Sequence, residues 1–444
     1  MVSVAWAIAV SLVVRPHLIQ DDQSAEFNRR VKPYTRYISS VNIMTESEAE
    51  DIQGRTYNAL TRRQQQQRLI QLATVFLRLG TIAFGGPAAH IAMMDNEVVN
   101  RRQWMSREKL LDLLGITNLI PGPNSTELAI HIGYERAGWL GLLIAGSCFI
   151  LPAMLIVWTL AAIYDRYQTV PQVEWLLYGI KPVIIAIVLQ AVWNLGKKAA
   201  KDVPTIVAGV AAITTYLAGL NEILVLVLLG VAVMLVKNRH RGHTTGVFLL
   251  PFSGVLAQVG NTTAVTSISW VSVFLFFLKI GSVLYGSGYV LLAFLQRDLV
   301  ERNQWLSSQQ LLDAVAIAQV TPGPVFTTAT FIGYLLAGNA GAIAGTIGIF
   351  LPAFVLVWLV NPWVPKLRQS PWASGFLDGV NAASLGLMAG VTYTLGRAAL
   401  VDLLTITVAI LSAIAVFRFK INSAWLVLAG GAIGLISHLL GFID

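Results

Sequence analysis

Two single cations lie in apolar segments of the chain, at matching positions of a sequence duplication. Arg78 lies in ATVFLRLGTIAFGG and Lys279 in FLFFLKIGSVLYGSG, each shortly before a glycine. A charge in the middle of a bilayer costs about 3 kcal/mol or more, so it normally pairs or faces a polar cavity. Two equivalent cations could neutralise one divalent oxyanion, the arginine as a flat fork and the lysine as a point charge. Snorkelling to an interface, or pairing with an acid such as Glu97, is the alternative.

Both copies contain a proline-glycine-proline tip, made of Pro121, Gly122 and Pro123 in the first and of Pro322, Gly323 and Pro324 in the second. Helices stop at such motifs because proline lacks an N–H and glycine frees the backbone. A helix that starts there inside a membrane presents unpaired N–H groups and a partial positive charge, which together favour an anion. The alternative is a pair of kinks that only help helices to pack.

Helix-start signals surround both tips. Asn124 and Glu127 have the spacing of a capping box, with Ser125 between them. In the second copy Thr321 could cap a helix that has Pro322 at its first position. We therefore count Asn124 and Ser125 among the candidate substrate-binding residues.

A glycine-rich break precedes each tip, with Gly85 and Gly86 in the first copy and Gly286 in the second. Small residues let the backbone approach a ligand or another helix closely, and both uses stay open. His90 follows the first break and His131 follows the first tip. Either could take up a proton, because imidazole titrates at about pH 6.5, or could be held in place by hydrogen bonds.

Three further charged residues rank below these candidates. Lys181 lies in an apolar segment and has no cationic counterpart in the second copy, where Asn381 stands. Asp112 and Asp313 match between the copies, but both lie near predicted helix starts. We therefore expect structural pairing of these two acids with arginine or lysine.

The duplication covers most of the chain. Residues 104–123, WMSREKLLDLLGITNLIPGP, align with residues 305–324, WLSSQQLLDAVAIAQVTPGP. A duplicated apolar unit with broken helices is typical of secondary transporters, whose site lies between two repeats at mid-membrane. The resulting division is listed by residue number: a polar N-terminal extension at 1–67, transmembrane repeat 1 at 68–236, a linker at 237–268 and transmembrane repeat 2 at 269–444.

Composition indicates a membrane protein. Hydrophobic residues make up 55% of the chain and charged residues 12%, against about 25% charged in a typical soluble domain. Nearly uncharged runs such as 138–163 and 203–236 reach the roughly 20 residues that a membrane span needs. We predict an all-α polytopic membrane protein with two homologous, inverted helical repeats. Half-length pieces at 110–120 and 124–134 predict broken, re-entrant helices around the first tip.

Charge alone leaves the orientation open. The basic residues of 101–109 and 197–201 outnumber those at the equivalent places of the second copy, which suits two repeats of opposite orientation. The basic clusters at 62–63 and 237–241, however, both resemble cytoplasmic ends. The number of spans is therefore not fixed by charge.

Several classes of protein and partner are excluded. The single cysteine, Cys148, permits neither an internal disulfide nor a thiolate cluster, so we expect no metal. Neither G-x-x-x-x-G-K-[ST] nor H-E-x-x-H occurs, so we expect neither an ATP-driven pump nor an enzyme, and no cofactor. The net charge of +8 comes from basic residues that flank apolar segments, so the expected partner is the lipid bilayer rather than nucleic acid. A homodimer is a further expectation.

Four motifs together resemble the chromate ion transporter family: FLRLGTIAFGGPAAHIA, RRQW, PGP and HIGYERAGWLG. The second copy resembles the long, two-repeat members, and the resemblance runs from about residue 69 to the C-terminus. It implies chromate export, chromate resistance and a place in the plasma membrane, with sulfate as a near-isosteric competitor and half-units of opposite orientation. It also places the family's FGGP and PGP motifs at residues 84–87, 121–123 and 322–324.

Two departures from the family pattern affect the anion chemistry. The second copy has Tyr-Gly-Ser-Gly at residues 285–288 instead of FGGP. Asn-Ser-Thr-Glu follows the first tip, where Glu127 would repel an oxyanion unless it were protonated or turned away. The main hypothesis is a chromate exporter; the alternatives are a transporter of sulfate or another anion, and a membrane scaffold without transport.

Overall fold

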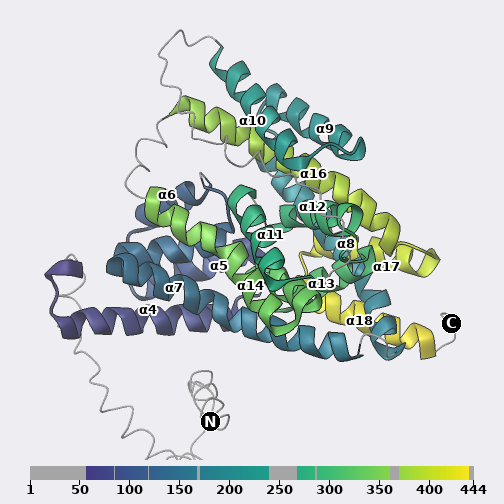
Figure 1. Ribbon diagram of the computed structural model, residues 1–444, viewed down its shortest axis with the longest axis horizontal. Helices are drawn as coiled ribbons and strands as arrows, with labels where there is room; N and C mark the ends of the chain where they lie inside the picture. The colour runs from purple at the N-terminus through teal and green to yellow at the C-terminus, as the bar shows by residue number, and fades with distance from the viewer. Residues whose placement is uncertain are drawn as a thin grey trace, which may run out of the picture. The chain divides into compact units, whose positions relative to one another are not determined.

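The computed structural model describes residues 57–84, 86–118, 120–167, 171–239, 268–285, 288–360 and 370–439. The chain divides into two compact units, residues 1–60 and 61–444. All the regular elements in the described ranges are helices, and those of the second unit are drawn in Figure 1. The Gly85 and Gly286 candidates lie outside the described residues.

The first repeat begins with α4 (Arg62–Ile82), which starts inside the segment predicted as an extension. The reason is a capping box at Thr61 and Gln64, which satisfies the first N–H groups of the helix. After the glycine break α5 (Gly86–Asp95) follows, and it continues into a π-helical turn, η2 (Asn96–Arg101).

The rest of repeat 1 consists of α6 (Arg107–Thr117), α7 (Asn124–Tyr167), α8 (Pro171–Ala199), α9 (Val203–Leu217) and α10 (Glu222–Asn238). Repeat 2 has the same order of helices, with a short α12 in place of α5: α11 (Trp270–Val283), α12 (Leu291–Leu295), α13 (Ser308–Val320), α14 (Thr328–Val360), α16 (Pro371–Ala399), α17 (Leu403–Phe419) and α18 (Ser423–Leu439). Short turns η4 (Gly288–Val290), η5 (Gln296–Arg302) and η6 (Val325–Thr327) connect its first half. A further turn, η1 (Tyr57–Ala59), precedes repeat 1.

A kink divides α7 and α14 at equivalent positions. In α7 Ala137 has φ −146° and Gly138 has φ 60°, and in α14 Ala337 has φ −146° and Gly338 has φ 60°. Glycine occupies the positive φ, which other residues rarely adopt. The first half of α7 is therefore a short helix between the first tip and this kink, in agreement with the predicted broken helices.

Close backbone contact fixes α4 against α7 and α11 against α14. A Cβ atom added at Gly80 would lie 2.6 Å from the carbonyl oxygen of Phe149, and one at Gly281 would clash with that of Ile349. Glycine in such places lets two helices approach each other's backbone. The two contacts are equivalent in the duplication, so both repeats begin with the same helix pair.

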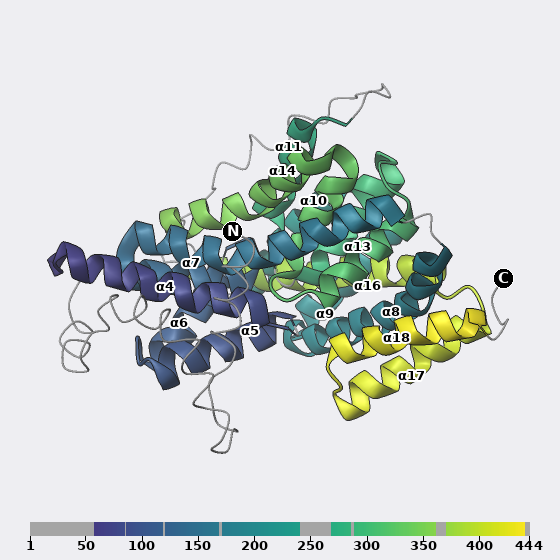
Figure 2. The same ribbon diagram turned by 90° about the horizontal axis from the view of Figure 1, so that it is seen from below.

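The two repeats are intertwined. Helices α9 and α10 of repeat 1 pack on α16 of repeat 2 (Figure 1), whereas α17 and α18 of repeat 2 pack on α8 of repeat 1 (Figure 2). Helices α7 and α14 also contact each other. Each repeat thus completes the core of the other, and residues 61–444 form one compact unit.

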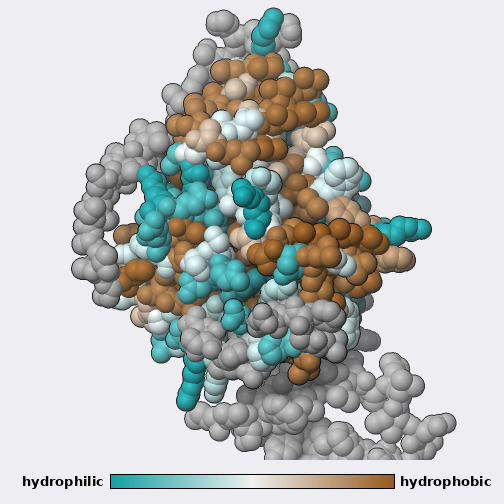
Figure 3. Space-filling view, turned by 90° about the vertical axis from the view of Figure 1, so that its right-hand side faces the viewer, coloured by the Kyte–Doolittle hydropathy of each residue, from teal (hydrophilic) through white to brown (hydrophobic). Residues whose placement is uncertain are grey.

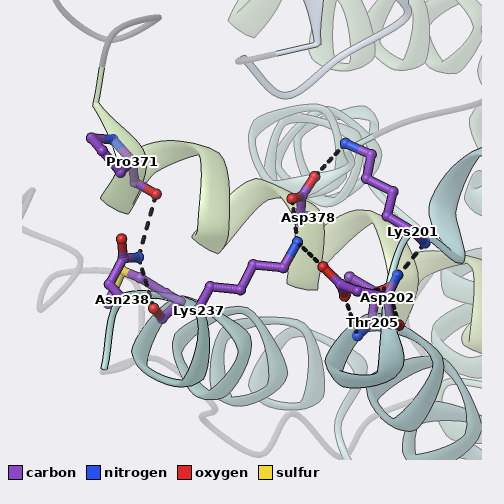
Figure 4. Close-up of polar contacts among 8 residues, drawn as sticks. Lys201, Asp202, Thr205, Lys237, Asn238, Pro371 and Asp378 are labelled. Carbon is purple, nitrogen blue, oxygen red and sulfur yellow. Dashed lines mark hydrogen bonds and ion pairs between the residues drawn. The ribbon is translucent and has the colours of Figure 1, made fainter. Parts of the chain in front are cut away.

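Ion pairs join the repeats where α9 begins. Lys237 Nζ lies 2.7 Å from Asp202 Oδ2 and 2.6 Å from Asp378 Oδ2, and Lys201 Nζ lies 2.6 Å from Asp378 Oδ1. Figure 4 shows Lys237 reaching between the two acids. At the equivalent place where α17 begins, the Tyr178 hydroxyl donates to Asp402. The two junctions lie at equivalent places of the two repeats but differ in chemistry: ion pairs hold one and a tyrosine hydroxyl the other.

Apolar side chains are exposed over much of the described surface. Leu403 is 80% exposed and Trp425 is 70% exposed, and Figure 3 shows broad hydrophobic areas on one face. Among the described residues, three helical segments are long and apolar enough to cross a membrane: Asn124–Tyr167, Glu174–Ala199 and Val325–Val360. An apolar exterior of this extent suits lipid rather than water, so this is an all-helical membrane protein.

Candidate functional site

The tips and the broken helices of the two repeats meet through reciprocal hydrogen bonds. The N–H of Gly122 donates to the carbonyl oxygen of Leu284 at 2.8 Å, and the N–H of Gly323 donates to that of Ala83 at 2.9 Å. Ala83 and Leu284 follow the last turns of α4 and α11. The structure therefore brings both proline-glycine-proline tips to the helix breaks, each to the break of the opposite repeat.

All six tip residues are buried. Gly122 has φ 141° and Gly323 has φ 96°, so glycine is required at both. Their N–H groups serve the contact between repeats and are not free donors for an anion. The predicted anion site at the tips therefore depends on side chains and on the helix that follows.

The predicted helix caps at the tips are wrong. Asn124 is already the first residue of α7, and among the described residues its Oδ1 has no partner. Its Nδ2 donates instead to Asn118 Oδ1 at 2.9 Å. Thr321 caps the C-terminus of α13, where its N–H donates to the carbonyl oxygen of Ile317.

His90 connects the first break to the start of α7. Its Nε2 lies 3.0 Å from the carbonyl oxygen of Ala83 and its Nδ1 lies 3.3 Å from Ser125 Oγ. Because a carbonyl only accepts, Nε2 carries a proton, and the neutral ring accepts the Ser125 hydroxyl at Nδ1. Ala83 also accepts from Gly323, so His90 and Ser125 are held at the crossing of the repeats.

Glu127 lies against the first tip. Its side chain is fully buried, and a Cβ atom added at Gly122 would collide with its Oε1. Within the described part of the chain neither carboxylate oxygen has a hydrogen-bond partner, and the same holds for both ring nitrogens of His131. The first half of α7 thus carries a buried polar strip on the tip side.

The second repeat matches this polar strip only in part. In either alignment register of the duplication, apolar residues replace Ser125 and His131: Val325 or Phe326, and Phe331 or Ile332. A buried threonine, Thr327 or Thr328, stands at the place of Glu127. The site is therefore symmetric in backbone and asymmetric in side chains, with the ionisable groups supplied by repeat 1.

Arg78 and Lys279 pair with separate acids. Arg78 Nη1 lies 3.4 Å from Glu97 Oε1, and Lys279 Nζ lies 2.9 Å from Asp298 Oδ2. The pairing of Arg78 with Glu97 was the alternative that the sequence left open. The side chains of Arg78 and Lys279 are 46% and 39% exposed. The structure places the two cations in equivalent clusters, one on each repeat, rather than beside a common partner.

The two clusters differ in charge. Glu97 contacts Arg101 at 2.5 Å and Arg102 at 3.3 Å besides Arg78, so one acid faces three cations in the first cluster. Asp298 contacts Arg302 at 3.9 Å besides Lys279, but Glu222 lies within electrostatic reach of both Asp298 and Lys279 and forms an ion pair with Arg297. The first cluster therefore has a surplus of positive charge, which attracts anions from solution, whereas the second is close to balanced.

A buried ion pair lies between α8 and α13. Lys181 Nζ is 3.1 Å from Asp313 Oδ1, and the Tyr164 hydroxyl donates to Asp313 Oδ2 at 2.8 Å. The predicted structural pairing of Asp313 with a basic residue is confirmed. Both ion-pair side chains are nearly inaccessible, at 6% and 5% exposure, so the pair joins the repeats inside the protein.

Sequence reasoning missed the Ala137–Gly138 kink and the role of Tyr164. The kink had a signal, because an Ala-Gly pair recurs at 337–338 in the aligned second copy. Tyr164 had none, because its partner Asp313 lies in the other repeat. Over the described ranges, groups of three or more His, Cys, Asp or Glu side chains that could hold a metal ion are absent.

Fold and site together define a membrane protein of two intertwined helical repeats whose broken helices cross at one place. The family model for chromate transporters matches residues 70–235 and 271–435, once on each repeat. The chain belongs to the chromate transporter family.

Curated relatives cover most of the chain. The probable chromate transport protein of Synechococcus elongatus is 34% identical over 79% of this chain and 90% of its own length. The chromate transport protein of Cupriavidus metallidurans is 32% identical over 84% and 94%, and that of Pseudomonas aeruginosa is 30% identical over 82% and 91%. No solved structure matches the chain.

Proposed function

We propose that this protein is a secondary transporter that exports chromate through the plasma membrane as a multi-pass protein and so confers chromate resistance. Family membership and relatives named for chromate transport support this assignment. The observation that carries it is the reciprocal bonding of Gly122 to Leu284 and of Gly323 to Ala83. Secondary transporters build their sites where broken helices of two repeats meet at mid-membrane.

The proposed path has an outer and an inner stage. Arg78, within its surplus-positive cluster, and Lys279 on the other repeat attract the dianion toward the tips. At the tips, the start of α7 offers a helix dipole together with the amide of Asn124. The Ser125 hydroxyl adds a further donor when it turns from His90 toward the anion. The two repeats have opposite orientations, so one cation cluster serves each side.

Export needs no ATP. A dianion that leaves a cell with a negative interior gains about 4.6 kcal/mol per 100 mV, which is twice the ~2.3 kcal/mol per unit charge. This gradient favours export over uptake for any divalent oxyanion. Sulfate, a divalent oxyanion of nearly the same shape as chromate, is expected to compete for the same site. A homodimer stays a prediction.

The experiment measures chromate accumulation in cells with and without this protein, at low and high external sulfate, and uptake of labelled chromate into inverted vesicles. Expression should lower accumulation, and the vesicles should take up chromate in a manner that excess sulfate reduces. Sulfate flux that chromate leaves unchanged would assign the protein to another anion. Vesicles that transport no oxyanion would support a scaffold instead.

A further inference from the structure

Glu127 is the buried carboxyl nearest to the proposed anion path. It lies on α7 just after the first tip, is 0% exposed and contacts Gly122. Across the residues that the structure describes, neither of its oxygens is hydrogen-bonded. An ionised carboxylate in such surroundings would be uncompensated, which is costly, so this arrangement suits the protonated acid.

The charged and titratable groups around Glu127 come from four elements. His131 lies one turn further along α7, and His90 on α5 reaches the same helix through Ser125. Tyr285, which follows α11, lies within electrostatic reach of Glu127. Lys109 on α6 lies within electrostatic reach of His131, but it forms its ion pair with Glu135, at 3.1 Å. Cationic charge near the site is thus engaged elsewhere, which leaves Glu127 without a counter-ion.

The second tip provides an internal comparison. Thr327 and Thr328 stand there in place of Glu127, in the two alignment registers. Their hydroxyls donate to the carbonyl oxygens of Pro324 at 2.8 Å and Val325 at 2.7 Å. The second tip therefore has the same backbone crossing with satisfied, neutral side chains. A structural role at a tip does not require a carboxyl.

We propose that Glu127 is a proton-binding site linked to the anion site. In the alkaline range, where the carboxyl of the empty protein has lost its proton, it takes up one proton as the dianion binds at the tips. This inference rests on the proposed function. A dianion beside a carboxylate is repelled, whereas beside the neutral acid it is tolerated. By reciprocity, a proton that favours anion binding is itself bound more tightly when the anion is present.

One consequence concerns the charge that moves. If the proton travels with the anion, each cycle carries one net negative charge instead of two. The driving force from the membrane potential is then about 2.3 kcal/mol per 100 mV rather than twice that. Export becomes sensitive to pH as well as to voltage.

The test measures proton uptake when chromate binds to the purified full-length protein. Chromate is titrated into the protein by calorimetry in buffers of different ionisation enthalpy, so that the heat reveals how many protons are taken up. The pH is alkaline, where chromate is fully a dianion. The wild-type protein should take up close to one proton per chromate, and its Kd should rise about tenfold per pH unit. Glu127→Gln should bind chromate without proton uptake and with a Kd independent of pH.

Two further variants serve as a substitute and a control for Glu127→Gln. Glu127→Thr, which copies the second tip, replaces the glutamine variant if that one fails to fold and should give the same result. Glu108→Gln removes an exposed carboxyl on α6 and should leave proton uptake unchanged. Proton uptake that persists in both Glu127 variants would overturn the proposal.

The remaining outcomes separate the two proposals. Chromate binding by the wild type without proton uptake, or binding that depends on added sodium instead, overturns the proton site and leaves transport standing. A wild-type protein that binds no chromate overturns the proposed function, on which this inference depends.

Discussion

The N–H of Gly122 donates to the carbonyl oxygen of Leu284 at 2.8 Å and thereby joins the tip of one repeat to the broken helix of the other. The bond from Gly323 to Ala83 repeats this relationship with the repeats exchanged. Because donor and acceptor always belong to different repeats, neither repeat can satisfy its own helix break. The two repeats must therefore fold together, as the packing of α16 on α9 and α10 also requires.

Gly323→Ala should disrupt this crossing. Gly323 has φ 96°, and an added Cβ atom would lie 2.5 Å from the Cβ of Ala153. The strained backbone costs about 1–3 kcal/mol, and overpacking adds about 1–3 kcal/mol. Thermal unfolding in detergent should show the loss of stability, and vesicles should lose chromate flux.

Gly115→Ala is the matched control for Gly323→Ala. Gly115 lies inside α6, and nothing lies within 4 Å of its added Cβ. Alanine in a helix interior is favoured over glycine by about 1 kcal/mol, so this variant should be as stable as the wild type or more stable. Equal stability of the two variants would contradict a structural role for the tip.

The sequence predicted the breaks because proline and glycine act locally. The tips at Gly122 and Gly323, the break before α5 and the half-length helices all follow from single residues and their neighbours. The caps at Asn124 and Thr321 were wrong, because a cap depends on where the helix actually begins. Asn124 is already helical, and Thr321 ends the preceding helix.

Partners in the opposite repeat were beyond the reach of sequence reasoning. Nothing near Lys181 in the sequence identifies Asp313 as its partner, and nothing near Gly122 identifies Leu284. The duplication identifies residues at equivalent positions of the two repeats, such as Arg78 and Lys279. It does not identify which residue each of them contacts. Sequence reasoning predicted two equivalent cations and offered Glu97 as a partner of Arg78, whereas the ion pair of Lys279 with Asp298 is known only from the structure.

Lys181→Met should be strongly destabilising. It leaves Asp313 buried with only the Tyr164 hydroxyl, and removing one member of a buried ion pair costs about 3–5 kcal/mol. The double variant Lys181→Met/Asp313→Leu should recover most of this loss, because no isolated charge remains. A double-mutant cycle from thermal unfolding measures the coupling. Additive single effects would show that the pair contributes no coupling.

Asp378→Asn should weaken the junction between α16 and α9. The variant removes the ion pairs of Asp378 with Lys201 and Lys237, which are partly exposed, so the expected loss is about 1 kcal/mol. The exposed residue Glu174, changed to glutamine, is the control and should leave the melting temperature unchanged. A melting temperature of Asp378→Asn equal to that of the control would show that these ion pairs add no stability.

The same junction makes stability depend on pH at both ends. Desolvation opposes the charge on Asp202, but hydrogen bonds from Lys237 and Thr205 outweigh it and lower the pKa of this carboxyl. Desolvation also opposes the charge on Lys237, but its bonds to Asp202 and Asp378 outweigh it and raise its pKa.

The contribution of Asp202 is therefore complete above its ordinary pKa of about 3.9 and is lost as the pH falls through the lowered value. The contribution of Lys237 to stability is complete below its ordinary pKa of about 10.4 and is lost as the pH rises through the raised pKa. Melting temperatures of the wild type and Lys237→Met should differ most between these limits and converge beyond both. A constant difference across the whole range would contradict the assignment.

Arg78→Ala and Lys279→Ala should each abolish chromate exclusion while the protein still inserts. Each cation is about half exposed and lies outside the core, so its loss weakens attraction of the dianion without opening the core. Chromate accumulation in cells, compared at matched membrane levels of each variant, provides the measurement.

Arg63→Ala provides the control for the two cation variants, because Arg63 is an exposed cation in the first turn of the same helix as Arg78. It removes one positive charge from α4 without touching either cluster, and should retain exclusion. Raised ionic strength should weaken chromate uptake into wild-type vesicles, since salt screens the attraction between the cations and the dianion. Full chromate resistance in both Arg78→Ala and Lys279→Ala would reject the role of these cations, because the clusters would then serve only to fix the π-helical turns beside them.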